Sequence, residues 1–450
     1  MSPQPSSFAG VSQDLEPVSL EPRPVKSLPE FTRRDRRSVL FAFLLTLAVG
    51  FLYIVLVPPG TPYDEPSHFG TVQYYASMKR MPVLGQPGVS YEAQMGPVFY
   101  TVAAVVYSIS HGGGAKVSFY LLRFLDLLLM YPLQYLTYRI VQCTVPGRRL
   151  LPLAAAVFTG LSPALLGIAA SIQNDMLAMV FAYWAVLFVW RSVRVGLPSP
   201  AAAVPAALIV SLAILTKLTA AFLIPALVLY LLIRYRFQAL AYIAAFVATI
   251  SACTGWWFAR NLVLYGDLTG SAGLRRFGYK NLGGPLRLEN VLHGQTYVRD
   301  ISGSFWLPNG YYRNLFHLSL PELALMLALF AVLGAICGSS AFFPRQSGLL
   351  PRAAISRNAQ IFFACLGGAS VMLYALMSFG VGNVAVRTTF PVYFLFALAM
   401  NAGGLEFARK YGRNERGWIV GMAAVMVFLS ILTVRHVHAV PLMGFNHLFG

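Results

Sequence analysis

The chain has 450 residues, of which 57% are hydrophobic and only 11% are charged. This composition excludes an ordinary soluble enzyme and indicates a polytopic membrane protein. A net charge of +18 could suggest a nucleic-acid partner, but in a membrane protein it more often reflects loops that face anionic lipid. The four cysteines are scattered in or beside apolar stretches, which argues against a disulfide framework or a thiolate metal site. They are Cys143, Cys253, Cys337 and Cys365.

Residues 1–37 contain prolines, serines and charges of both signs, which predicts a disordered tail. Four arginines directly precede the first apolar stretch and predict that this tail lies in the cytoplasm. A membrane-spanning helix needs about 20 apolar residues. The sequence offers about eleven such stretches, near residues 38–58, 117–140, 150–170, 176–194, 203–217, 219–234, 239–257, 321–341, 360–378, 389–405 and 418–434.

The basic residues predict which connections lie inside the cell. With a cytoplasmic amino terminus, every predicted inner loop has at least two basic residues, as the positive-inside bias expects. The outer side then carries two long segments, 59–116 and 258–320, and a short carboxy-terminal tail, 435–450. The spans fall into three groups, 38–58, 117–257 and 321–434. We therefore predict a multi-pass cell (inner) membrane protein whose active site is extracytoplasmic.

An Asp-Glu pair opens the first outer segment. Asp64 precedes a short predicted helix, and Pro66 is tolerated in its first turn. His68 lies one turn after Asp64 on the same helix face. A second helical stretch, Met95–Ser110, is too short to span comfortably, and we expect both helices to lie along the membrane surface. Only 16 residues are acidic, and a charge so close to hydrocarbon indicates a functional site.

Further charged residues lie at the predicted outer ends of the spans. Asp175, beside Asn174, lies in the tight turn between the third and fourth spans, and Lys217 ends the fifth. Clustered cations next to lipid suit a phosphate or pyrophosphate head group, which Arg and Lys neutralise and orient. Three arginines occupy equivalent positions at the second, seventh and tenth spans, namely Arg123, Arg260 and Arg387.

Each candidate also has a structural explanation. Asp64 and Asp175 can simply cap the helices that they precede, and the basic side chains can reach out to lipid head groups. Asp64, Glu65 and His68 are suitable metal ligands. The sequence shows no second ligand cluster, so we predict no metal site or other cofactor and leave a divalent cation open.

Six short motifs follow one another between residues 63 and 306, within a match that covers most of the chain from the first span to the tenth. They are Tyr63–Phe69 (YDEPSHF), Tyr91–Tyr100 (YEAQMGPVFY), Ser171–Asp175 (SIQND), Leu215–Thr219 (LTKLT), Arg260–Asp267 (RNLVLYGD) and Ser304–Trp306 (SFW). In these motifs the chain resembles bacterial polytopic glycosyltransferases of the GT-C fold, the group related to protein O-mannosyltransferases and the lipid A aminoarabinose transferase. It departs where relatives often have His-Gln-Pro-Pro, because it has Gln94-Met95-Gly96-Pro97 there. This departure weakens a role of that segment in acceptor binding.

The resemblance implies an all-α, GT-C-like enzyme that transfers a sugar from a polyprenyl-phosphate donor on the outer face. The acceptor would be an envelope glycan, glycolipid or protein. The resemblance also implies a catalytic acidic residue in the first outer loop, which here is Asp64. Asp175 matches the second acidic position of the family, and three basic positions are matched by Lys217, Arg260 and Arg387.

We expect Asp64 to take the proton of the acceptor hydroxyl, a contribution of about 10²–10⁴ in rate. Glu65 and Asp175 would then orient the acceptor, and a single displacement would invert the anomeric centre. The basic residues Lys217, Arg260 and Arg387 would hold the departing phosphate. The other expected substrate-binding residues are Arg123, His68, Tyr100 and Trp306. The segment 258–320, rich in glycine and tyrosine, suits an acceptor site or a structural cap over the bundle.

A transporter or flippase of an anionic lipid-linked substrate is the alternative function. Such proteins tend to show two related halves with broken helices near the midplane. This sequence shows no similarity between its halves, and its candidate charges gather on one face. A catalytically silent relative that organises other envelope enzymes is a third alternative.

Overall fold

The computed structural model describes residues 29–60, 64–194, 196–278, 355–381, 386–410 and 414–438, and every regular element in these ranges is a helix. The predicted all-α class is therefore confirmed for this part of the chain. Most of the predicted tail 1–37, the predicted span 321–341, most of the outer segment 258–320 and the end of the carboxy-terminal tail lie outside the described residues.

The first part of the chain forms one long helix, a layer of short helices and two further helices that run on from each other. Thr32 and Asp35 form a capping box at the start of the first helix, which fixes where it begins. The elements are α1 (Arg33–Leu56), α2 (Glu65–Met78), η1 (Tyr91–Gln94), α3 (Pro97–Ser110), η2 (His111–Gly113), α4 (Ala115–Leu128) and α5 (Met130–Thr144).

The middle of the chain supplies most of the bundle. It contains α6 (Leu151–Leu161), α7 (Pro163–Ala169), α8 (Asp175–Val193), η3 (Pro200–Ala202), α9 (Ala203–Thr216), η4 (Leu218–Phe222), α10 (Leu223–Tyr235), η5 (Arg236–Ala239) and α11 (Leu240–Tyr265). The described remainder adds α12 (Ser271–Arg276), α17 (Arg357–Val381), η6 (Val386–Val392), α18 (Tyr393–Lys410) and α19 (Glu415–His438).

Seven helical stretches in the described residues are long and apolar enough to cross a membrane, or eight if the bent pair α6 and α7 counts as one span. This supports a multi-pass membrane protein, but the eleven predicted spans are not confirmed. The predicted span 203–217 corresponds to the short helix α9. The predicted spans 219–234 and 239–257 fall in one continuous apolar stretch, Leu218–Tyr265.

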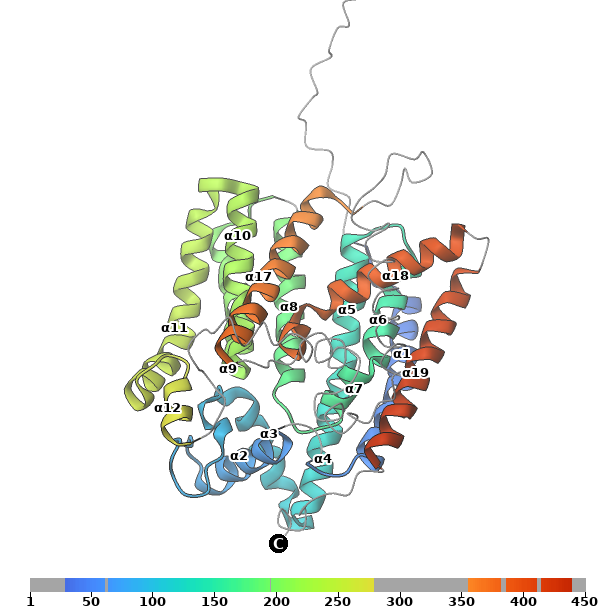
Figure 1. Cartoon of the computed structure of the whole chain (residues 1–450). Coiled ribbons are helices and arrows are strands. Elements are labelled where there is room, and N and C mark those ends of the chain that lie inside the picture. Colours follow the sequence, from blue (N-terminus) through green and yellow to red (C-terminus); the bar gives the residue numbers. More distant parts are fainter. Residues whose placement is uncertain are drawn as a thin grey trace, which may run out of the picture.

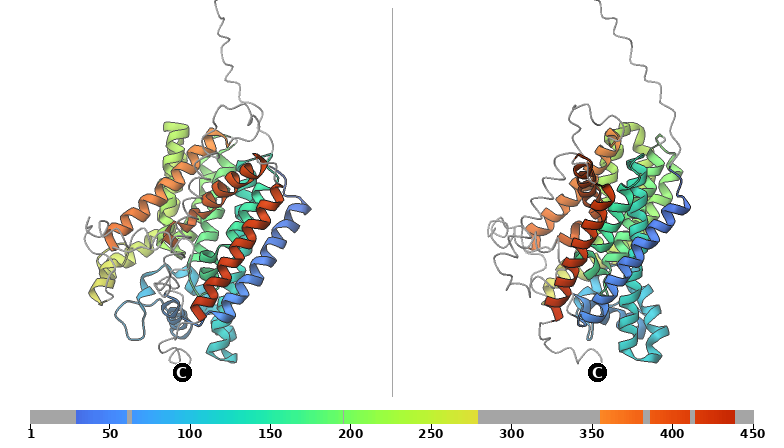
Figure 2. Two further views of the ribbon diagram at one scale, coloured as in Figure 1. Left: turned by 45° about the vertical axis from the view of Figure 1, so that its right-hand side comes forward. Right: turned by 90° about the vertical axis from the view of Figure 1, so that its right-hand side faces the viewer.

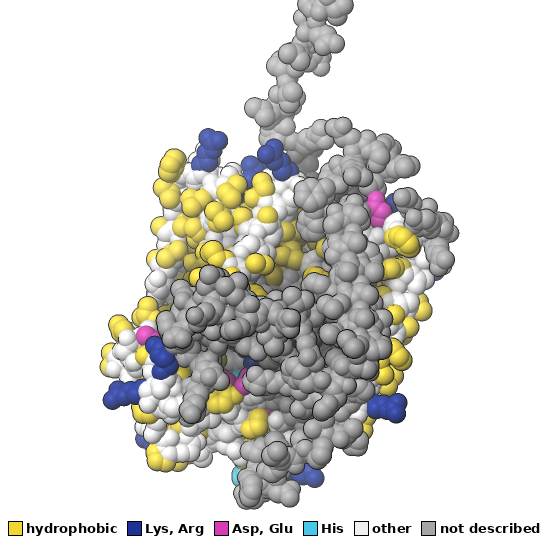
Figure 3. Space-filling view, viewed as in Figure 1, with side chains coloured by type: hydrophobic (Ala, Val, Ile, Leu, Met, Phe, Trp, Pro, Cys, Tyr) yellow, Lys and Arg dark blue, Asp and Glu magenta, His cyan; other side chains and the backbone are white. Residues whose placement is uncertain are grey.

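The bundle interior is built around α5, α6, α8 and α9. Helix α6 packs against α1, α5, α18 and α19, and small side chains make this possible because Ala154, Ala155 and Ala156 are fully buried. Figure 1 shows α5 and α6 next to each other with α18 crossing them obliquely, and Figure 2 shows α1 next to α19 at one edge of the bundle. Hydrophobic side chains cover the outer surface over α10 and α11, as contact with lipid requires (Figure 3).

Helices α2 and α3 pack against each other at one end of the bundle, together with η1 (Figure 1). They match the two short helices predicted in the first outer segment, although α3 begins at Pro97. Gly96 brings this layer onto the bundle: a Cβ atom there would lie 2.0 Å from the backbone oxygen of Leu215. That close approach places the layer directly over the end of α9, where Lys217 follows.

Candidate functional site

Asp64 lies at the point where the chain turns into α2. Its backbone is left-handed, with φ 68°, a conformation that Asp and Asn adopt more readily than most residues. Within the described residues its side chain makes no capping hydrogen bond to α2. The structural explanation of Asp64 as a helix cap is therefore not supported, and its carboxylate is directed elsewhere.

The Asp64 carboxylate binds two side chains from other segments. Its Oδ1 accepts a hydrogen bond from the Tyr91 hydroxyl, and its Oδ2 forms an ion pair of 2.5 Å with Nη2 of Arg387. Burial alone would raise the pKa of Asp64, but the Arg387 guanidinium and the Tyr91 hydroxyl outweigh it and hold the pKa below its ordinary value. Asp64 is therefore ionised at neutral pH.

A second ion pair joins Asp175 and Lys217. Asp175 is the first residue of α8, and Lys217 occupies an extended break between α9 and η4, with φ −151° and ψ 123°. Their Oδ2 and Nζ atoms are 2.7 Å apart. The amide of Asn174 donates to the backbone oxygen of Thr216 at 3.1 Å and so holds the start of α8 against the end of α9.

Arg387 connects the two ion pairs. Its Nη1 lies 3.9 Å from Oδ2 of Asp175, and the same nitrogen donates to Oε1 of Gln173 at 3.1 Å. Gln173 is in turn held by its backbone N–H, which donates to Asp126 at 3.0 Å. We call the four joined residues the charge cluster: Asp64, Asp175, Lys217 and Arg387.

The charge cluster is largely shielded from solvent but not closed. The side chains of Asp64, Lys217 and Arg387 are 12–16% exposed and that of Asp175 is 7% exposed. Two acids and two bases leave it without net charge. The structure thus brings together four of the residues that the sequence predicted to converge, from segments more than 300 positions apart.

Glu65 and Arg123 form a separate, fully buried pair. Arg123 Nε and Nη2 donate to the two Glu65 oxygens at 2.7 and 2.6 Å, and neither side chain is exposed. Glu65 also accepts from the backbone N–H of Gly60 and Ile172, while Arg123 donates to the carbonyl oxygens of Ile54 and Val57. The predicted roles in acceptor orientation and substrate binding therefore have little geometric support, because these groups are occupied with the framework.

His68 on α2 and Tyr100 on α3 form a buried pair. The Tyr100 hydroxyl and His68 Nδ1 are 2.7 Å apart, and both residues are at most 2% exposed. Burial lowers the pKa of His68 to about 3, so the imidazole is neutral at physiological pH. Its Nε2 lies 3.9 Å from Oε1 of Glu92, which is itself buried.

The contacts that Arg260 makes within the described residues are with groups outside the charge cluster. Its guanidinium donates to the Pro82 carbonyl at 2.6 Å and lies 4.8 Å from the centre of the Trp257 ring. Trp306, the other predicted aromatic contact, lies outside the described residues. Among the described residues, no three His, Cys, Asp or Glu side chains are grouped so that they could hold a metal ion.

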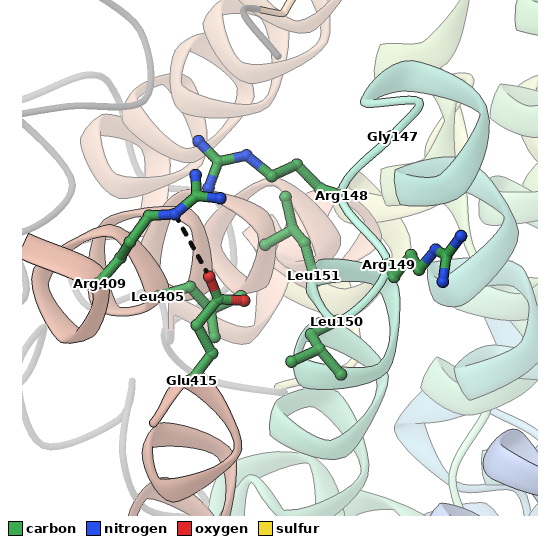
Figure 4. Close-up of a pocket in the computed structure, with 8 residues that line it drawn as sticks. All are labelled: Gly147, Arg148, Arg149, Leu150, Leu151, Leu405, Arg409 and Glu415. Carbon is green, nitrogen blue, oxygen red and sulfur yellow. Dashed lines mark ion pairs between the residues drawn. The ribbon is translucent and has the colours of Figure 1, made fainter. Parts of the chain in front are cut away.

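A pocket of about 210 Å³ lies at the opposite end of the bundle, where α6 begins and α18 is followed by α19 (Figure 4). Arg148, Arg149 and Arg409 line it, and Arg409 pairs with Glu415 at 3.7 Å. The pocket contains none of the predicted site residues and is not part of the candidate site.

The sequence did not assign roles to three residues that the structure places at the site: Tyr91, Glu92 and Gln173. Each stands inside a motif that carried the resemblance, beside a residue of interest or close to one. Tyr91 and Gln173 contact charge-cluster side chains directly. Their position within these motifs could therefore have identified them as candidate site residues. A polar residue within such a motif is a candidate even when it is not the expected acid or base.

Comparison with known proteins gives structural matches only. No family model matches the chain, and no curated protein matches it in sequence. The solved structures that match include ArnT from Cupriavidus metallidurans bound to undecaprenyl phosphate, with 17% identity over 89% of this chain and 74% of that one, at a TM-score of 0.49.

The oligosaccharyltransferase of Archaeoglobus fulgidus also matches in its apo form, with 11% identity over 89% of this chain and a TM-score of 0.47. The same archaeal protein, AglB, in complex with an inhibitory peptide and a dolichol-phosphate, matches with 11% identity over 90% of this chain and a TM-score of 0.44. This chain spans only 55–56% of the oligosaccharyltransferase. These proteins are GT-C fold membrane glycosyltransferases.

Proposed function

We propose that the protein is a membrane glycosyltransferase that moves a sugar from a polyprenyl-phosphate donor to a hydroxyl of an envelope glycan, glycolipid or protein. The observation that carries this proposal is the charge cluster, in which Arg387 reaches both acids and Lys217 completes a pair of cations. A phosphate next to lipid is the ligand that such a pair suits best. We further propose that the charge cluster faces the extracytoplasmic side.

Donor binding would exchange one set of ion pairs for another. The donor phosphate competes with Asp64 and Asp175 for the guanidinium of Arg387 and the ammonium of Lys217. When Arg387 turns towards the phosphate, Asp64 loses its strongest partner and becomes a better proton acceptor. The ion pairs thus hold the side chains of Lys217 and Arg387 in place before the donor binds. A phosphate can then bind them without a large side-chain movement.

The transfer itself is a single displacement. The acceptor O–H bond breaks and its proton passes to Asp64, while the acceptor oxygen bonds to the anomeric carbon of the sugar. The bond from that carbon to the phosphate oxygen breaks, and its electron pair leaves with the polyprenyl phosphate. Lys217 and Arg387 stabilise the charge that develops there, where one positioned donor is worth on the order of 10²–10³ in rate. The configuration at the anomeric carbon inverts.

Turnover by the purified protein tests this function against the alternative of a transporter. A transferase in detergent should release polyprenyl phosphate from a polyprenyl-phosphate sugar with a labelled sugar, because the reaction needs no second compartment. A transporter should leave the donor intact in detergent and move it only across the bilayer of a vesicle. The second result, obtained across a panel of donor sugars and acceptors, would refute the proposal.

A further inference from the structure

Glu92 is a buried carboxyl group to which the proposed reaction gives no role. It belongs to η1, directly after Tyr91, whose hydroxyl binds Asp64. Glu92 is 3% exposed, and among the described residues its Oε2 atom has no hydrogen-bond partner. Buried polar atoms are nearly always paired, so an unpaired one next to a reaction centre calls for a ligand or a water molecule.

The second Glu92 oxygen faces His68 across a gap. Oε1 lies 3.9 Å from Nε2 of His68, which is too long for a direct hydrogen bond. Tyr100 fixes the imidazole by its contact of 2.7 Å with Nδ1 and by stacking of the two rings. If the Tyr100 hydroxyl donates to Nδ1, the neutral imidazole carries its hydrogen on Nε2, directed at Glu92.

A single hydroxyl group could bridge these two atoms, which are 3.9 Å apart. An oxygen at about 2.8 Å from both Nε2 of His68 and Oε1 of Glu92 can accept a hydrogen bond from the first and donate one to the second. A neighbouring hydroxyl of the same ring then remains to pair with Oε2 of Glu92. We propose that Glu92 and His68 form a subsite that binds a hydroxyl of the donor sugar, beside the phosphate held by the charge cluster. This inference rests on the proposed function. The group that the subsite recognises is the polyhydroxylated ring of the donor sugar.

The protonation of Glu92 agrees with this position. Burial and the neighbouring Asp64 carboxylate raise the pKa of Glu92 to about 8. Glu92 is therefore mostly neutral at pH 7, and it can sit close to a donor phosphate without repelling it. Above pH 8 it ionises, and the added negative charge should weaken donor binding. The titratable or charged groups that face it are Asp64, His68, Tyr91, Tyr100, Asp175, Lys217 and Arg387.

The test compares two lipids, a polyprenyl-phosphate sugar and polyprenyl phosphate without sugar. The ratio of their dissociation constants isolates the contribution of the sugar. In Glu92→Leu we expect that ratio to fall about tenfold, as expected for the loss of one or two well-placed hydrogen bonds, while the affinity for polyprenyl phosphate stays near that of the wild type. Glu415→Gln, at the far end of the bundle, is the matched control and should change neither affinity.

Glu92→Gln adds a pH profile that a purely structural role would not produce. Wild-type affinity for the sugar donor should decline as pH rises through about 8, and the glutamine variant, which stays neutral, should lose this decline. An unchanged sugar contribution in Glu92→Leu would mean that water alone fills the gap and would overturn the inference. An unchanged decline in Glu92→Gln would mean that Glu92 does not lie beside the bound phosphate, and would overturn it as well. Failure of the wild type to bind polyprenyl phosphate would instead refute the proposed function.

Discussion

At the scale of single residues, the site consists of charges that neutralise one another before any ligand arrives. Arg387 and Lys217 each pair with an acid, and their positions are set by contacts that do not depend on a ligand, such as the hydrogen bond from Arg387 to Gln173. Preorganised cations lower the cost of binding a phosphate because little is left to rearrange.

This arrangement predicts which basic residues hold the donor. Lys217→Gln and Arg387→Gln should each weaken binding of polyprenyl phosphate by at least tenfold, because a charge-assisted bond to phosphate is lost. Arg260→Gln should have a much smaller effect, since its guanidinium is bound to Pro82 and stacked on Trp257. Titration of a fluorescent polyprenyl phosphate in detergent measures all three. An equal loss in Arg260→Gln would extend the phosphate site to α11, as the sequence suggested.

The sequence could identify acids and bases, but it could not show how they pair. Asp64 and Glu65 are adjacent, yet the first joins the charge cluster and the second is locked to Arg123. The difference arises because consecutive residues at the start of a helix point in different directions. One carboxylate faces η1 and η6, and the other faces α4.

At the scale of elements, the buried pair of Glu65 and Arg123 holds several segments in register. Arg123 on α4 reaches the last carbonyls of α1, and Glu65 at the start of α2 reaches the turn before α8. Asp175 begins α8 three residues after Ile172, whose N–H binds Glu65. The pair therefore positions the backbone that carries the charge cluster.

Removing one partner of the Glu65–Arg123 pair should therefore lower the stability of the protein more than it lowers the rate of transfer. Glu65→Gln leaves the Arg123 guanidinium buried without its counter-charge, a loss of about 3–5 kcal/mol in unfolding free energy. We expect a clearly lower unfolding temperature in detergent, with transfer per folded molecule reduced far less than in an Asp64 variant. Normal stability together with abolished transfer would contradict this and would return Glu65 to contact with the substrate.

At the scale of the whole molecule, apolar composition was enough to predict the all-helical membrane class, but the number of spans was not predictable from it. Helix α9 has only 14 residues, and the chain breaks at Lys217 before η4 and α10 continue. Proline and polar residues can end a helix within a stretch that is apolar overall. Counting apolar residues along the sequence does not detect such a break. These breaks matter for the proposed function because Asp64, Asp175, Lys217 and Arg387 all stand at helix ends or interruptions.

The predicted orientation can be checked with single cysteines at two exposed positions at opposite ends of the bundle, introduced after the four native cysteines are replaced by serine. Arg80 follows α2, and Arg149 precedes α6. In intact cells whose outer barrier is permeabilised, a membrane-impermeant maleimide should label Arg80→Cys and not Arg149→Cys. Labelling of both after lysis is the control. The reverse pattern would place the charge cluster on the cytoplasmic side and contradict the proposed localisation.

The most direct measurement of the central claim is the stereochemistry of the transferred sugar, determined by NMR before mutarotation. The protein is given a donor of known anomeric configuration. When the assay contains no natural acceptor, water serves as the acceptor and the donor is hydrolysed. The wild type should give the inverted product. Asp64→Asn, which tolerates the left-handed backbone, should be slower by about 10²–10⁴ per folded molecule. Retained configuration, or equal rates in both proteins, would contradict a single displacement assisted by Asp64 at the charge cluster.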